Sequence, residues 1–146
     1  MSGNYDDVLY NAVLEGNLDQ IKSVLDRDQY FLTGCLRHGW PLLLMACNEA
    51  QLDIVRFLIE EKGVDVNLAW VLKTPLMVAC ESSRDPVNVY QMVILLLEYG
   101  AVINCKDNYG MTPLMSAIIN GHTEVVKLII DQASLDATDN EGLTVG

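Results

Sequence analysis

The sequence predicts an all-α solenoid in which short antiparallel helix-turn-helix hairpins stack in a row. The first observation behind this prediction is a Thr-Pro-Leu segment that occurs at 74–76 and again at 112–114. Counting the slots at positions 41, 74, 112 and 144, the intervals are 33, 38 and 32 residues. The second observation is that two short apolar stripes at helical spacing follow each complete slot. A hairpin this small cannot cover its own apolar face, so a stable fold requires stacked copies.

The first element is a hairpin at about 6–33, and it differs from the others. Ala12, Gly16-Asn17 and Ile21 fall at the positions expected for two helices and the turn between them, but no Thr-Pro precedes the first helix. Its outer face is polar, as the ends of a solenoid require. We therefore expect residues 6–33 to form an N-terminal capping repeat.

The next elements are complete repeats at 37–67, 70–104 and 107–136, followed by the start of a truncated repeat at 140–146. In the third of these repeats, Thr112 is expected to cap a helix through its hydroxyl, and Pro113 suits the first helical position. Asn120-Gly121 ends that helix, and a second helix starts at Thr123. The whole chain is thus predicted to form one domain.

The middle repeat is five residues longer than the one before it. The surplus falls between its two helices at 82–88, where Pro86 is expected to end or restart a helix. In the same repeat, Leu72 takes the place of a turn glycine, which leaves the shape of that turn open.

Composition limits the classes of function. With 51% hydrophobic residues among 146, the chain can bury one sizeable core, and no apolar run approaches the length of a membrane span. The amino terminus has no basic start and no apolar stretch typical of a signal peptide, so we expect a cytosolic or nuclear protein with no membrane contact from this segment. Nine basic against twenty acidic residues disfavour direct nucleic-acid binding and favour a partner with basic segments.

No pattern in the sequence indicates catalysis. Cys35, Cys47, Cys80 and Cys105 lie far apart without a C-x-x-C pair, so we expect free thiols rather than a zinc or redox site. No nucleophile with a nearby base and no phosphate-binding glycine loop is present. His122, which sits in the Gly-His turn, is expected to satisfy backbone groups. The sequence therefore predicts a non-enzyme with no cofactor and no metal ion.

The period near 33 residues, the Thr-Pro-Leu opening and the Gly121-His122 turn resemble the ankyrin repeat. This resemblance implies a curved solenoid with short β-hairpin fingers, whose finger tips and inner helices hold partner proteins without performing chemistry. The usual histidine after Thr-Pro-Leu is replaced by Leu44, Met77 and Met115. We therefore expect a weaker hydrogen-bond network between neighbouring turns.

A narrower set of motifs resembles the ankyrin region of a family of germ-cell proteins that join ankyrin repeats to a sterile alpha motif and a leucine-zipper-like segment. This resemblance implies a scaffold that recruits piRNA-processing factors for transposon silencing and gametogenesis. It also implies a cytoplasmic location, with the longer protein at the mitochondrial outer membrane or in germ granules. The matching segments are Gly39-Trp40, Ala79-Cys80, Leu95-Leu96-Leu97, Thr112-Pro113-Leu114-Met115 and Gly121-His122-Thr123-Glu124-Val125-Val126.

Reading the finger positions and the inner helices gives a candidate partner-binding surface. Trp40, Trp70 and Tyr109 are its expected anchors, because Trp and Tyr often dominate interface energy. A finger Trp could instead fold back over the step between two repeats, and this alternative stays open, as does an architectural role through self-association. The remaining candidate residues are Arg37, His38, Lys73 and Met111 on the fingers and Asn48, Glu81 and Ile119 on the inner helices.

Overall fold

The computed structural model describes residues 2–36 and 39–141, and the side chains of residues 5–36 and 39–132. Within these residues the chain forms eight α-helices and one 3-10 helix, η1, with isolated β-bridges in place of longer strands. The helices are α1 (Ser2–Glu15), α2 (Leu18–Arg27), η1 (Gln29–Leu32), α3 (Leu42–Asn48), α4 (Leu52–Glu60), α5 (Pro75–Glu81), α6 (Pro86–Glu98), α7 (Pro113–Ile119) and α8 (Thr123–Glu141).

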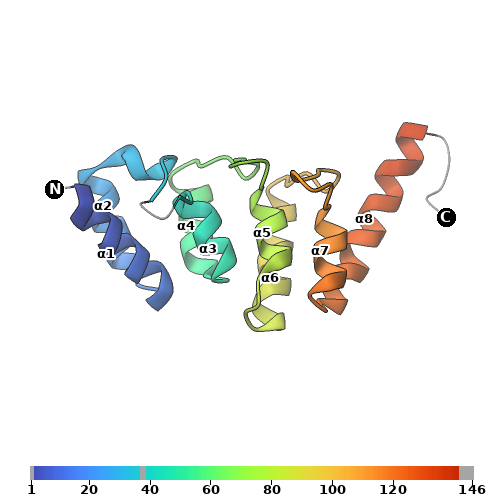
Figure 1. Ribbon diagram of the computed structural model, residues 1–146, viewed down its shortest axis with the longest axis horizontal. Coiled ribbons are helices and arrows are strands. Elements are labelled where there is room, and N and C mark those ends of the chain that lie inside the picture. The colour runs from blue at the N-terminus through green and yellow to red at the C-terminus, as the bar shows by residue number, and fades with distance from the viewer. Residues whose placement is uncertain (1, 37–38, 142–146) are drawn as a thin grey trace.

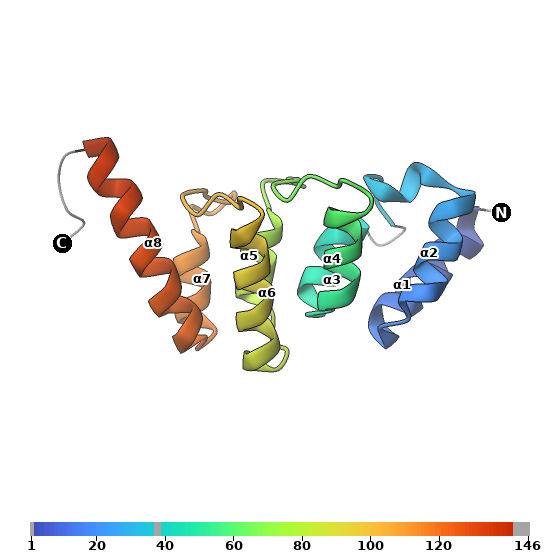
Figure 2. The same cartoon turned by 180° about the vertical axis from the view of Figure 1, so that it is seen from behind.

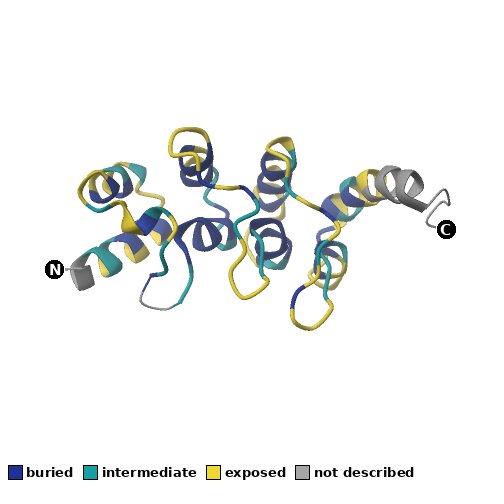
Figure 3. Cartoon of the chain, turned by 90° about the horizontal axis from the view of Figure 1, so that it is seen from above, coloured by how far each residue is buried: buried dark blue, intermediate teal, exposed yellow. Residues whose placement is uncertain are grey.

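The helices form two layers that run side by side along the molecule. The inner layer consists of α1, α3, α5 and α7, and it faces the viewer in Figure 1. The outer layer consists of α2, α4, α6 and α8, and it faces the viewer in Figure 2. Each inner helix contacts the outer helix that follows it and the inner helix of the next hairpin. The predicted all-α solenoid is therefore confirmed. The finger loops lie along one edge and project beyond the inner layer (Figure 3).

The inner helices begin where the sequence places their caps. The hydroxyls of Thr74 and Thr112 accept hydrogen bonds from the backbone N–H groups of Met77 and Met115, at 3.3 and 3.2 Å. A proline occupies the first helical position of both α5 and α7. This position needs no amide donor, so proline starts the helix there without losing a hydrogen bond.

Neighbouring inner helices approach closely because small or flexible side chains lie between them. Cys47 and Cys80 are completely buried at equivalent positions of α3 and α5, where they act as small packing residues. Leu44 and Met77, which stand where the family has histidine, are also buried. Burial of the Leu44 side chain and of the Met77 side chain each stabilises the fold by roughly 1.5–3 kcal/mol, because apolar surface is removed from water.

A hydrogen bond joins each pair of successive hairpins along the edge opposite the fingers. Gln51 donates from its side-chain amide to the carbonyl of Val13 at 2.7 Å, and the hydroxyl of Ser82 donates to the carbonyl of Asn48 at 2.7 Å. Nε2 of His122 lies 2.8 Å from the carbonyl oxygen of Ser82. The prediction that His122 bonds a backbone group is thus confirmed.

The extra residues of the middle repeat form mainly helix, whereas the sequence suggested a bulge between helices at 82–88. Helix α6 has 13 residues and α4 has nine, so the surplus adds about one turn to the start of α6. Asp85 caps this turn by accepting the N–H of Val87 at 2.8 Å, and Pro86 takes the first helical position. Proline restarts a helix here, as one of the two expected outcomes.

The carboxyl-terminal end differs from the predicted repeat boundaries. The last complete repeat was expected to end at residue 136 and a truncated repeat to start at residue 140, but α8 continues as one helix to Glu141. Glycines with positive φ follow α4 and α6 at Gly63 and Gly100, and α8 has no glycine at the matching point. Without that residue the helix lacks its usual stop signal. Residues 142–146, which include the expected Gly-Leu-Thr start of a further repeat, lie outside the described residues.

Candidate functional site

The middle finger, residues 70–73, is a tight hairpin with an unusual turn. Trp70 and Lys73 exchange two backbone hydrogen bonds of 2.8 Å, and the two residues between them, Val71 and Leu72, have φ values of 50° and 62°. Two-residue hairpin turns of this kind favour Asn-Gly, because positive φ is costly for side chains that carry a Cβ and most of all for β-branched ones. Here the missing glycine leaves the hairpin intact but strained.

The side chains of this strained turn find no compensating burial. Val71 is 65% exposed and Leu72 is 56% exposed. Neither conformational preference nor core packing therefore explains two branched apolar residues at these positions. Backbone strain of this kind often occurs at sites that bind another molecule.

The third finger is held rigid by Asp107. Its carboxylate accepts the backbone N–H groups of Tyr109 at 2.8 Å and Met111 at 3.0 Å, while its own N–H donates to the carbonyl of Met111. Gly110 supplies the positive φ that closes the loop. The side chain of Tyr109 is 88% exposed at the tip. A fixed backbone therefore presents its ring to solvent.

The first finger places Trp40 against the core. The N–H of Leu36 donates to the carbonyl of Trp40 at 2.9 Å, and Cys35 forms a bridge with Pro41. The indole ring of Trp40 is half-buried and packs against the hydrophobic core. The side chain of Trp40 is therefore partly folded back onto the core, as one alternative expected, and partly accessible to a partner, as the other expected. Arg37 and His38 lie outside the described residues.

The three fingers together line one groove of about 340 Å³ on the inner side. It brings together the three aromatic residues predicted as anchors and Lys73, although these residues are distant in sequence. Sequence reasoning missed Leu44 and Asp107 as lining residues; the Asp-Asn-Tyr-Gly turn was a signal for the second of them. The groove is lined by Trp40, Leu44, Trp70, Val71, Lys73, Asp107, Asn108 and Tyr109.

Lys73 and Asp107, which line this groove, form an ionic cluster with Glu81 of α5. The ammonium of Lys73 lies 2.9 Å from Asp107 and also bonds Glu81. Partial burial alone would lower the pKa of Lys73, but its hydrogen bonds to Glu81 and Asp107 outweigh burial and raise it. The bond from Lys73 lowers the pKa of Asp107 against the opposing effect of burial, and the N–H groups of Met111 and Tyr109 lower it further. The raised pKa of Lys73 and the lowered pKa of Asp107 both favour the charged forms of these two groups near neutral pH.

The inner-helix candidates are less uniform. Asn48 lines a second hollow together with Tyr10, Trp40, Met45 and Glu49, so Trp40 borders both hollows. Glu81 belongs to the ionic cluster, as described above. Ile119 and the half-buried Met111 line neither hollow, although Ile119 is strongly exposed on α7. The structure therefore gathers most of the described candidates around Trp40 and Lys73.

Three kinds of feature were compared with the part of the chain that the structure describes: metal-binding clusters, reactive thiols and membrane-spanning helices. No group of three or more His, Cys, Asp and Glu side chains is placed to hold a metal ion. Burial raises the pKa of the Cys47 thiol, and it raises that of Cys80 to about 12. Nucleophilic chemistry at neutral pH needs the thiolate, which is disfavoured at both. No helix among the described residues is both long and apolar enough to span a bilayer.

Comparison with known families agrees with this architecture. The sequence model described as ankyrin repeats (3 copies) matches residues 9–107 and 72–141. The chain belongs to the ankyrin-repeat family. Ankyrin repeats typically form non-catalytic modules that bind other proteins.

Several individual proteins are similar in sequence to this chain. The ankyrin repeat, SAM and basic leucine zipper domain-containing protein 1 of Ornithorhynchus anatinus is 29% identical over 130 residues, covering 89% of this chain and 27% of that protein. The protein of the same name from Mus musculus is 32% identical over 115 residues, covering 79% and 24%. A putative ankyrin repeat protein of fowlpox virus is 38% identical over 108 residues, covering 70% and 30%. The chain thus spans about a quarter of the length of the first two relatives.

Proposed function

We propose that this chain is a recruitment module that holds a basic segment of a partner protein in the groove between its fingers. The observation that carries this proposal is the turn at Val71 and Leu72. It is strained and apolar, it is exposed to solvent, and it stands at the rim of a groove with Trp40 and Tyr109. Docking of a partner would bury this apolar surface and give the strain a function.

The charge of the groove supports a basic occupant. The one ammonium in the groove, that of Lys73, is paired with two carboxylates, Asp107 in the groove and Glu81 on α5, and the whole chain carries a formal charge of −11. Lys and Arg side chains also interact favourably with the faces of Trp and Tyr, and Arg stacks on them. A basic segment therefore gains both cation–π contacts and long-range attraction, and its association rate should fall as salt concentration rises.

The narrower proposal is that the partner is a piRNA-processing factor in germ cells. Its support is the set of matching motifs and the identity of about 30% with the ankyrin repeat, SAM and basic leucine zipper domain-containing proteins. On this proposal the chain acts in the cytoplasm, and a longer protein that contains it lies at the mitochondrial outer membrane or in germ granules.

Affinity capture from germline extract tests both levels. We expect the Trp40→Ala/Trp70→Ala double variant to lose at least tenfold of the captured partner, because each substitution removes a wall of the groove. Tyr99→Ala is the matched control, since it removes an exposed aromatic ring at the end of the outer helix α6. Equal capture by the double variant would show that the groove is not the binding site. A captured set without piRNA-processing factors would remove only the narrower proposal.

A second candidate function is self-association, which one observation on α7 favours. Met115 and Ile118 are 45% and 58% exposed, whereas Met77 and Cys80 at the same positions of α5 are buried. Two copies that packed these faces together would cover the same kind of surface that successive repeats cover. Sedimentation over a concentration series tests this candidate. A monomer at all concentrations, unchanged by Ile118→Glu, would exclude it.

A further inference from the structure

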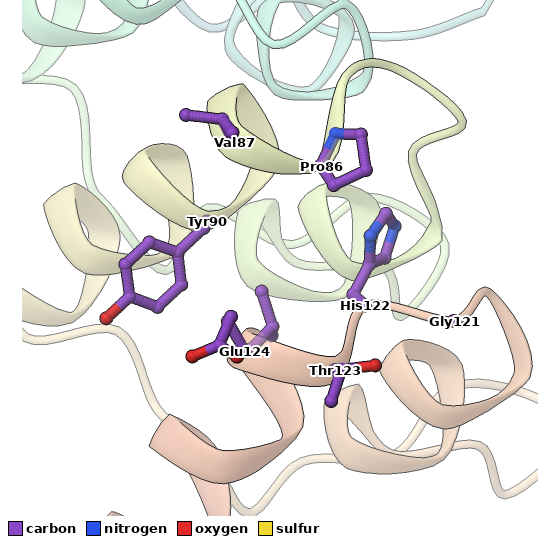
Figure 4. Close-up of a pocket in the computed structure, with 8 residues that line it drawn as sticks. Pro86, Val87, Tyr90, Gly121, His122, Thr123 and Glu124 are labelled. Carbon is purple, nitrogen blue, oxygen red and sulfur yellow. The ribbon is translucent and has the colours of Figure 1, made fainter.

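A second pocket lies along the edge opposite the fingers, between the first turns of α6 and α8 (Figure 4). Its volume is about 260 Å³ and its walls are mainly apolar. The additional first turn of α6 supplies one wall with Pro86, Val87 and Tyr90, and the segment 121–125 supplies the other. The pocket is therefore a product of the five extra residues of the middle repeat.

One buried polar atom of this pocket lacks a partner. His122 is 5% exposed, and no hydrogen-bond partner for its Nδ1 occurs among the residues that the structure describes. Its Nε2 bonds the carbonyl of Ser82, which does not line the pocket, whereas the ring of His122 does line it (Figure 4). Gln51, which occupies the equivalent position before α4 two repeats earlier, makes a similar bond to the carbonyl of Val13.

The bond to Ser82 determines what Nδ1 can do. A carbonyl oxygen can only accept a hydrogen bond, so Nε2 must carry the proton that it donates. In the neutral ring Nδ1 is then an acceptor with a free lone pair. A buried acceptor of this kind is stabilised by an incoming O–H or N–H group.

The rest of the pocket restricts which donor fits. An aliphatic side chain would fill the apolar space and leave Nδ1 unpaired. A cationic head would have to give up its hydration in an apolar site, and the one carboxylate at the rim, Glu124, already pairs with Lys127 at 3.4 Å. An anion would meet that carboxylate. An aromatic ring with one neutral donor satisfies both the walls, which include Pro86 and Tyr90, and the acceptor.

We propose that this pocket binds a Tyr or Trp side chain of a partner protein, whose O–H or N–H donates to Nδ1 of His122. The pocket has room for about one ring system and is smaller than most cavities for free ligands. Val87 is 62% exposed beside it and offers apolar surface to the segment that carries the ring. This site lies on the opposite edge from the finger groove and is independent of the function proposed for that groove.

Matched small probes test the chemistry of the pocket on the intact chain. In ¹H–¹⁵N NMR spectra, 3-methylindole or p-cresol should shift the amide signals of Val87 and Tyr90 and the Nδ1 signal of His122. The N-methylated and O-methylated probes, 1,3-dimethylindole and 4-methylanisole, lack the donor and should bind about tenfold more weakly. Equal affinities within each pair, or no shift at these signals up to the solubility limit, would overturn the proposal.

Variants of α6 test whether the small probes and a protein partner bind in the same pocket. Val87→Glu places a charge at the pocket and should abolish probe binding, whereas Gln91→Glu adds the same charge to an exposed position on the same helix outside the pocket. Circular dichroism should show both variants folded. Phage-displayed peptides that 3-methylindole elutes from the chain should be rich in Tyr or Trp and should fail to bind Val87→Glu. Eluted peptides without these residues, or binding that survives Val87→Glu, would contradict a docked aromatic side chain.

Discussion

Replacing Val71-Leu72 by Asn-Gly should make the protein more stable and its finger groove less able to bind. Left-handed backbone costs roughly 1–2 kcal/mol for an ordinary L-residue, and both residues adopt it. Asn and Gly remove most of this cost. The added flexibility of glycine in the unfolded chain lowers the gain in stability by about 0.5–1 kcal/mol. Little burial is lost, because both side chains are mostly exposed. The expected net gain is about 1–2 kcal/mol in the free energy of unfolding.

Urea unfolding followed by circular dichroism measures this gain. For a chain of this size the same gain corresponds to a rise of roughly 2–8 °C in Tm. Val102→Asn is the matched control, because Val102 is also exposed but is not among the described residues with positive φ. That control should change stability by less than about 0.5 kcal/mol. A double variant no more stable than the wild type would show that the turn is not strained in solution.

Binding gives the second readout of the same variant. The proposed function predicts weaker capture of the partner by Asn-Gly, because the apolar rim of the groove is removed while its ionic cluster is intact. Higher stability with unchanged capture would leave the account of the strain standing and would remove Val71 and Leu72 from the binding surface.

Three further predictions concern charge, the cross-repeat bonds and nucleic acid. Because its folded pKa is lowered, Asp107 contributes stability that is present above about pH 4 and is lost as pH falls through the folded value. In urea titrations across pH, Lys73→Met should be less stable than wild type near pH 7, and the difference should shrink toward pH 2. Ser82→Ala leaves the carbonyl of Asn48 without its donor and should cost about 1–3 kcal/mol in the same assay, whereas the exposed Ser83→Ala should cost less than about 0.5 kcal/mol. In a gel-shift assay at moderate salt we expect no RNA binding, and a salt-sensitive shift would contradict the inference from net charge.

Local sequence signals were sufficient for the helices of the repeats. The Thr-Pro pairs at 74–75 and 112–113 cap helices as predicted, because both the hydroxyl acceptor and the missing amide act within one turn. Asp85-Pro86 likewise restarts a helix. The sequence left open whether Pro86 ends or restarts a helix, and the cap that Asp85 provides to the N–H of Val87 is the contact that accompanies the extra turn of α6.

The candidate site was predicted in part. The three aromatic residues proposed as anchors were singled out because finger positions recur with the repeat, and the structure places all three on one groove. Their role in binding stays a prediction. The ionic cluster was missed, since Lys73, Glu81 and Asp107 come from two fingers and a helix and meet only after two repeats have stacked. The sequence likewise could not show that Nδ1 of His122 has no hydrogen-bond partner among the described residues. The orientation of the ring depends on the bond between its Nε2 and the carbonyl of Ser82, which lies 40 residues away.

The sequence by itself determined the repeat period, the start of most helices and the apolar faces that force the hairpins to stack, since these depend on residues within a few turns of one another. Only the tertiary structure decided where the strained turn of Val71 and Leu72 stands relative to Trp40, and that Lys73 pairs with both Glu81 and Asp107. It also decided which nitrogen of His122 has no hydrogen-bond partner among the described residues. Those features depend on distances between repeats, and such distances are set by how the buried side chains of neighbouring hairpins fit together.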